Sequence, residues 1–275
     1  MSELAMTVQN PARTALAEPT DIQLIWRSGL AWLLMLTLFS LAALLVDARE
    51  LDGVNVWAKP LKFSISTTLH FATMLLCLSV VRRDQQDAYW LRVATWAAAV
   101  AMVFEMSYIF VQAAQAEHSH FNADSNFHRV MYGLMGIGAV TLIAVSAVIG
   151  LAAWFSRNIP PALRHGITTG LIGGFVLTLI VAGYLGGNGS HFVGVPAPDA
   201  PTVPLFGWSR TVGDLRPAHF LALHMMQLVP LAGWMLARFA PSRGVVSVWA
   251  FALAYVALTA GVFVQARMGL PLISA

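Results

Sequence analysis

The sequence has few charged residues, a single cysteine and only two lysines. The low charge and the single cysteine each limit what kind of protein this is. Charged residues make up 11% of the 275 residues, whereas a soluble globular domain has about a quarter. Most of this protein's surface must therefore face something other than water. The single cysteine, Cys77, excludes an intrachain disulfide. The arginines are scattered and form no basic stripe, so we expect no nucleic-acid partner.

Long apolar runs take the place of the missing charges. Hydrophobic residues make up 58% of the chain, and the mean hydropathy is +0.69. Each run is close to the roughly 20 residues that a helix needs to cross a bilayer, and far longer than the roughly 10 residues of a barrel strand. Because lipid offers no partner to backbone N–H and C=O groups, helices are the spanning structure that fits. The sequence predicts an all-α bundle of about seven spans, at Gln23–Val46, Phe63–Val81, Trp90–Gln115, Phe127–Phe155, Leu163–Gly187, Arg216–Phe239 and Val245–Met268.

These spans are predicted to form one transmembrane domain over residues 23–275, after a polar tail at residues 1–22. The tail lacks the charged-then-apolar order of a cleaved signal, so the first span is expected to remain as an anchor in the lipid bilayer. Most links are short, but residues 188–215 form a long outer loop rich in Gly and Pro. Arginines favour the links after spans two, four and six, which places the N-terminus in the cytoplasm and the C-terminus outside.

Two predicted spans each carry a stripe of polar side chains. On the second span they recur every four positions, and on the third every three or four, which aligns each set along one helix face. The sets are Lys62, Ser66 and His70 on the second span, and Glu105, Tyr108, Gln112 and Gln115 on the third. Glu105 is the only acid deep inside any span, where an unpaired charge is costly. We therefore expect a functional role for Glu105, or an ion pair with Lys62.

The sixth span adds a third group of polar residues, Arg216, His219, His224 and Gln227. At about 1.5 Å per residue, His70, Glu105 and His224 lie roughly 12–16 Å below the outer ends of their helices, so they are expected to meet at one level. His219 and His224 are five positions apart, which turns them about 140° from one another on a helix. The two are not expected to hold one ion together.

A second polar layer lies in the predicted outer loops. All the histidines except His165 fall in the outer half of the spans or in outer loops, including His120 after the third span and His191 at the start of the long loop. Each loop histidine could equally be an ordinary solvated side chain. Lys59 and Lys62 could likewise extend toward the membrane surface without binding anything.

Three stretches resemble a family of uncharacterised bacterial polytopic membrane proteins. They are Lys59-Pro60-Leu61-Lys62-Phe63, Ser119-His120-Phe121-Asn122, and Gly213-Asp214-Leu215-Arg216 with His219, His224 and Gln227. The resemblance covers most of the chain, from the second span through the sixth. It implies a multi-pass protein of the bacterial inner membrane, and it implies no activity.

The favoured hypothesis is a metal- or haem-binding protein, with redox activity as one outcome, because imidazole and carboxylate groups bind Zn, Cu and Fe. The cofactor would be a transition metal or haem b. The metal ligands would be His70, Glu105 and His224, with His120, His191 and His219 as an outer alternative. Catalytic roles would fall to Glu105 and Lys62. The cofactor would contact His70, Tyr108, Gln112, His224 and Gln227.

Two other functions stay open. One is a proton-coupled transporter or channel-like carrier of a small solute, in which Glu105 relays protons while Lys59 and Lys62 draw anions to the outer mouth. The absence of a visible inverted repeat and the odd number of spans fit common carriers poorly. The other is a ligand sensor or assembly factor. In every case the partner is a small molecule or ion that arrives from the outer side.

Overall fold

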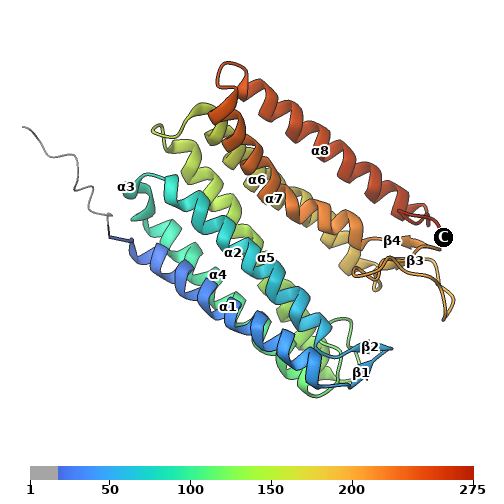
Figure 1. The fold of residues 1–275 in the computed structure, drawn as a ribbon. Helices are drawn as coiled ribbons and strands as arrows, with labels where there is room; N and C mark the ends of the chain where they lie inside the picture. Colours follow the sequence, from blue (N-terminus) through green and yellow to red (C-terminus); the bar gives the residue numbers. More distant parts are fainter. Residues whose placement is uncertain (1–17) are drawn as a thin grey trace, which may run out of the picture.

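Seven long helices dominate the computed structural model, which describes residues 18–275 (Figure 1). They are α1 (Asp21–Val46), α2 (Ala58–Val80), α4 (Tyr89–Ala114), α5 (Asn126–Phe155), α6 (Pro161–Gly187), α7 (Arg216–Phe239) and α8 (Gly244–Arg267). All seven are long and apolar enough to cross a membrane. The predicted all-α bundle of seven spans is confirmed, and the protein is a multi-pass membrane protein.

The largest difference from the predicted span ends lies at α2, which begins at Ala58 and not at Phe63. Its first turns are polar, so an apolar run starts later than the helix itself. The earlier start places Lys59 and Lys62 on the helix. The polar tail predicted for residues 1–22 lies mostly outside the described residues, and α1 begins at Asp21 after a capping box made by Thr20 and Gln23.

Successive long helices alternate in direction, so α1 begins at one end of the bundle and α8 finishes at the other (Figure 1). We call these the N-terminal end and the C-terminal end. The short helix α3 (Arg83–Gln86) lies at the N-terminal end. The C-terminal end carries two small antiparallel pairs, β1 (Glu50–Leu51) with β2 (Val54–Asn55), and β3 (Phe192–Val193) with β4 (Gly213–Asp214). This end is the one predicted to face outward.

The core extends through the whole bundle. Large side chains such as Trp26, Phe71 and Met106 are buried between α1, α2, α4 and α5. Helices α6 and α7 approach closely because glycines meet: a Cβ built on Gly166 would lie 2.8 Å from the Cα of Gly233. Small residues on α6 therefore form a packing surface, as membrane helices commonly use. The outer faces of the helices keep large apolar side chains exposed, as a lipid environment requires.

The long loop, residues 188–215, folds back onto the start of α7. Asp214 anchors it: this side chain is 2% exposed and pairs with Arg216 at 2.6 Å. The Asp214 carboxylate also accepts hydrogen bonds from the backbone N–H groups of Ser209 and Arg216, at 2.9 and 3.0 Å. Arg216 in turn donates to the carbonyl of Gly207 at 2.6 Å. The loop is thus tied to α7 through one buried ion pair.

Candidate functional site

Basic side chains gather at the C-terminal end, beginning with the first turns of α2. Lys59 is half-buried there, with its Nζ 6.0 Å from the centre of the Phe63 ring, and Lys62 is exposed one turn further on. Neither lysine forms an ion pair within residues 18–275. Most cations near a membrane are paired or reach water, so two unpaired lysines on one helix end are free to attract an anion.

The loop between α4 and α5 places His120 beside this lysine pair. The His120 ring lies 5.4 Å from the ring of Phe63 and 6.3 Å from the ring of Tyr132 on α5. Burial, together with the charge of Lys59, lowers the pKa of His120 to about 3. His120 is therefore neutral at physiological pH and shares a hydrogen bond of 3.1 Å with the Ser119 hydroxyl.

The long loop supplies a second neutral histidine to the same region. Burial lowers the pKa of His191 to about 4, helped by the charges of Arg216 and Lys59 and opposed by the charge of Asp214. Both α2 and α7 therefore place a positive charge near this ring. Arg216 also lies close enough to Lys62 for their charges to act on one another. We call Lys59, Lys62, His120, His191 and Arg216 the basic cluster.

The lowered pKa of His191 predicts acid-sensitive stability. Because the folded protein binds this proton only near pH 4 and the unfolded chain near pH 6.5, stability is retained above pH 6.5 and falls as the pH drops toward 4. His191→Gln should weaken that fall by about 1 kcal/mol per pH unit at most, discounted because the ring is partly exposed. Thermal unfolding at several pH values measures the difference. His118→Gln, an exposed histidine at the same end, is the control, and an equal effect of both variants would refute the prediction.

On α4, the side chain of Gln112 hydrogen-bonds to the loop that follows the helix and, within residues 18–275, to none of the other predicted cofactor-binding residues. Its amide donates to the carbonyl of His118 at 3.1 Å and to the carboxylate of Glu117 at 3.3 Å, which closes the loop after the helix. Tyr108, one turn deeper, is 7% exposed and packs beside Phe63 and Met135. Its hydroxyl has no hydrogen-bond partner among the described residues.

Glu105 lies deeper still, 5% exposed, against α5. Its Oε1 atom occupies the space where Gly138 has no side chain, and this oxygen has no hydrogen-bond partner in residues 18–275. The alternative ion pair with Lys62 is not formed. The reason is geometric: Lys62 sits in the first turns of α2 near Arg216, whereas Glu105 lies nine residues inside α4 and faces α5.

The predicted inner ligands are each engaged by different neighbours. The Nε2 atom of His70 hydrogen-bonds to the carbonyl of Leu142 on α5 at 3.1 Å. Glu105 contacts Gly138, one turn away along α5. His224 instead stacks on Phe220 of its own helix, with ring centres 3.9 Å apart. The structure therefore relates two of the three residues through α5 and leaves His224 on α7.

The other predicted α7 residues also stay apart. The Nδ1 atom of His219 is buried without a partner among the described residues, and Gln227 is half-buried about one turn beyond His224. Across residues 18–275, no group of three or more His, Cys, Asp or Glu side chains is placed to hold a metal ion. Neither the inner set of metal ligands nor the outer set of His120, His191 and His219 gains support from the structure.

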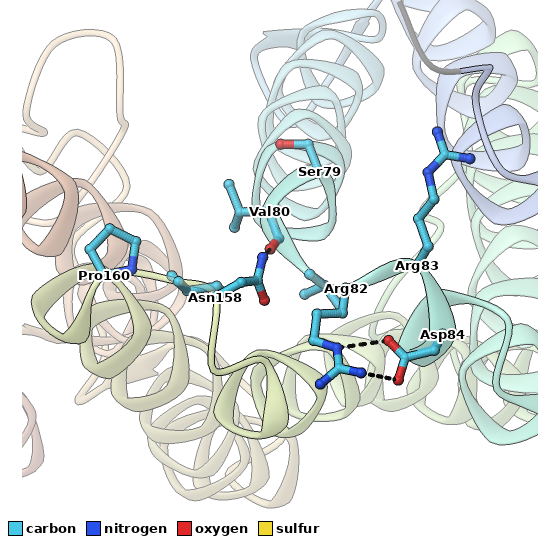
Figure 2. Close-up of a pocket in the computed structure, with 9 residues that line it drawn as sticks. Ser79, Val80, Arg82, Arg83, Asp84, Asn158 and Pro160 are labelled. Carbon is cyan, nitrogen blue, oxygen red and sulfur yellow. Dashed lines mark hydrogen bonds and ion pairs between the residues drawn. The ribbon is translucent and has the colours of Figure 1, made fainter.

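A hollow lies at the N-terminal end, between the end of α2, α3 and the link from α5 to α6 (Figure 2). Its charged lining residues are already engaged. Arg82 pairs with Asp84 at 2.8 Å, and Arg83 donates to the carbonyl of Glu18 at 2.6 Å. This hollow therefore offers less unpaired charge than the basic cluster, which is the stronger candidate site.

Sequence reasoning missed the residues that shape these sites. Tyr132 beside His120, Gly138 beside Glu105 and the buried anchor Asp214 all became visible only from the packing. A signal existed for Gly138, since it belongs to a glycine-rich turn of α5 with Gly133 and Gly136.

Comparisons with protein-family models, with curated proteins and with solved structures gave no match. The resemblance to bacterial polytopic membrane proteins stays a prediction.

Proposed function

We propose that this membrane protein binds a small anionic solute, of the phosphate or carboxylate type, at the basic cluster. One observation carries the proposal: Lys59 lies near both neutral histidines, Arg216 lies near His191, and Lys62 lies near Arg216, so positive charge from two helices converges on two loops. The acid whose charge acts on this group, Asp214, is already paired with Arg216. The cluster therefore has an excess of positive charge that an anion would neutralise.

The residues of the basic cluster would contact an anion in different ways, because their side chains differ in charge and in free N–H groups. The Nε and Nη2 atoms of Arg216 are committed to Asp214 and Gly207, so it would act on an anion mainly through its charge. The two lysines have no such commitment and can turn their ammonium groups toward a ligand. A neutral imidazole presents one N–H donor, which His120 and His191 could offer to an oxygen of the anion. At the end of a membrane bundle these interactions are stronger than in bulk water.

The same site would serve a carrier that takes up a solute or a sensor that reports one. The anion would arrive at the C-terminal end, the side that the arginine distribution predicts to face outward. A metal or haem centre has less support, because its predicted inner ligands are dispersed over α2, α4 and α7, and two of them, His70 and His224, bond to backbone carbonyls.

Titration of the purified full-length protein with inorganic phosphate and with succinate tests the proposal. We expect saturable binding of at least one of these anions by calorimetry at low ionic strength, and none of choline. The double variant Lys59→Gln/Lys62→Gln should weaken binding at least about 100-fold, because each charge-assisted hydrogen bond contributes about 1.5–3 kcal/mol.

Arg129→Gln is the matched control, since it removes one exposed positive charge at the same end outside the cluster. It should bind within about threefold of the unaltered protein, as expected for a screened surface charge. No anion binding by the unaltered protein, or equal losses in the control and the double variant, would overturn the proposal.

A further inference from the structure

Below the basic cluster, a file of polar side chains follows one face of α5 toward the middle of the bundle. His120 lies beside Tyr132, Tyr108 packs on Met131 and Met135, Glu105 contacts Gly138, and His70 bonds to the carbonyl of Leu142. The α5 positions 132, 135, 138 and 142 are three or four residues apart, so they lie on one helix face. Four polar side chains from α2, α4 and a loop are therefore stacked in order of depth.

The two central members of this file have unpartnered polar atoms. The hydroxyl of Tyr108 and the Oε1 of Glu105 are buried, and neither has a hydrogen-bond partner in the described chain. Buried polar groups in proteins are nearly always satisfied, so an exception calls for a ligand, a water or a functional reason. The two residues are one turn apart on α4, which makes a shared role the economical explanation.

No described cation pairs with Glu105. Its own helix contributes the titratable Tyr108, and α2 contributes His70, whose Nε2 is committed to Leu142. The facing positions of α5, Met135, Gly138 and Leu142, have no charge. An ionised carboxylate without a cation is costly in such surroundings, so the neutral acid is the form that this position favours.

We propose that Glu105 is a proton-binding site which exchanges with the C-terminal end by way of Tyr108 and His120, and that its protonation is linked to anion binding. The second half rests on the proposed function. In the exchange step the O–H bond of the Glu105 carboxyl breaks, and the proton passes to a water molecule at Tyr108 that carries it toward the cluster. Uptake reverses the step. An anion bound in the cluster adds negative charge near the file, which favours the protonated carboxyl, and by linkage a protonated Glu105 favours the anion.

Proton access is one-sided. Toward the N-terminal end, the file ends at His70, whose Nε2 is committed to the carbonyl of Leu142. The shared core beyond this level is formed mainly by buried apolar side chains, among them Met74, Ala98 and Val145. The structure therefore assigns Glu105 to binding-linked protonation from one side, and it predicts no passive proton conduction through the bundle.

Infrared spectroscopy of the full-length protein in lipid nanodiscs tests the first half. The unaltered protein should show the carbonyl stretch of a protonated carboxyl at neutral pH, and that band should shift on transfer to D₂O without unfolding. Glu105→Gln should lose the band, and Glu50→Gln, an exposed acid on β1, should keep it. Tyr108→Phe should keep the band and slow its shift in D₂O at least tenfold.

Several outcomes would overturn this half. They are a band that persists in Glu105→Gln, a band in the unaltered protein that does not exchange with D₂O, or no such band at all. The last two need no variant, so the test stands even if Glu105→Gln fails to fold. Exchange at an unchanged rate in Tyr108→Phe would remove Tyr108 from the path.

The linkage between Glu105 protonation and anion binding has its own test. This test distinguishes a missing linkage from a missing anion site. Inorganic phosphate should raise the pH at which the Glu105 band disappears in the unaltered protein. In Lys59→Gln/Lys62→Gln the band should remain but lose its response to phosphate. A phosphate-binding protein whose band ignores phosphate would refute the linkage and leave the proposed function intact.

Discussion

Asp214→Asn is expected to lower the free energy of unfolding by about 1.5–3 kcal/mol, because the buried carboxylate loses its charge-assisted hydrogen bonds while the partner Arg216, 31% exposed, remains partly hydrated. Asparagine has nearly the same size, so lost packing contributes little. The substitution removes the charge that holds Arg216 at 2.6 Å and weakens the acceptor for the backbone N–H of Ser209. Thermal or chemical unfolding in detergent measures the change.

Asp84→Asn is a matched control for this result. Asp84 pairs with Arg82 across the same two-residue spacing, but both side chains are about half exposed, at 54% and 49%. An exposed pair of this kind contributes about 0–1 kcal/mol. Asp214→Asn should also weaken anion binding, since Arg216 loses its fixed position in the basic cluster. Equal unfolding free energies for the two variants would show that the long loop is not anchored through Asp214.

The bundle could be predicted from the sequence because hydropathy and length alone determine where a chain crosses a bilayer. Every predicted span corresponds to one helix, and the error at α2 has a simple cause. Lys59 and Lys62 interrupt the apolar run, yet they leave the backbone hydrogen bonds of a helix intact. A method that follows apolarity therefore starts the second span too late.

The candidate site could be predicted only in part. Residue spacing correctly aligned Glu105 with Tyr108 on α4, because helical periodicity is a local property. Which helix each stripe faces depends on packing between distant segments. For this reason the sequence could not show that His224 lies apart from His70 and Glu105. The His224 ring stacks on Phe220, which itself lies against Trp208 of the long loop, 5.8 Å between ring centres. No local pattern in the sequence indicates that contact.

Gly138→Ala is expected to destabilise the protein by about 1–3 kcal/mol, as overpacking of a filled site does. A Cβ at this position would overlap the Oε1 of Glu105, so either the carboxyl must move or α4 and α5 must separate. Gly136→Ala is the matched control on the same helix, because a Cβ there would meet nothing within 4 Å. Alanine is a better helix former than glycine by about 1 kcal/mol, so the control should be neutral or slightly stabilising.

A double-mutant cycle with Glu105→Ala identifies the cause. Shortening Glu105 removes the atoms that the new Cβ would meet, and the alanine methyl at position 138 partly fills the space that the carboxyl leaves. The cost of Gly138→Ala should therefore fall sharply in the Glu105→Ala background, with a coupling of about 0.5–3 kcal/mol, as expected for residues in direct contact. Unfolding measurements on the four proteins give this coupling. Strict additivity would mean that Gly138 does not seat the Glu105 carboxyl, and the proton-binding site would lose its structural basis.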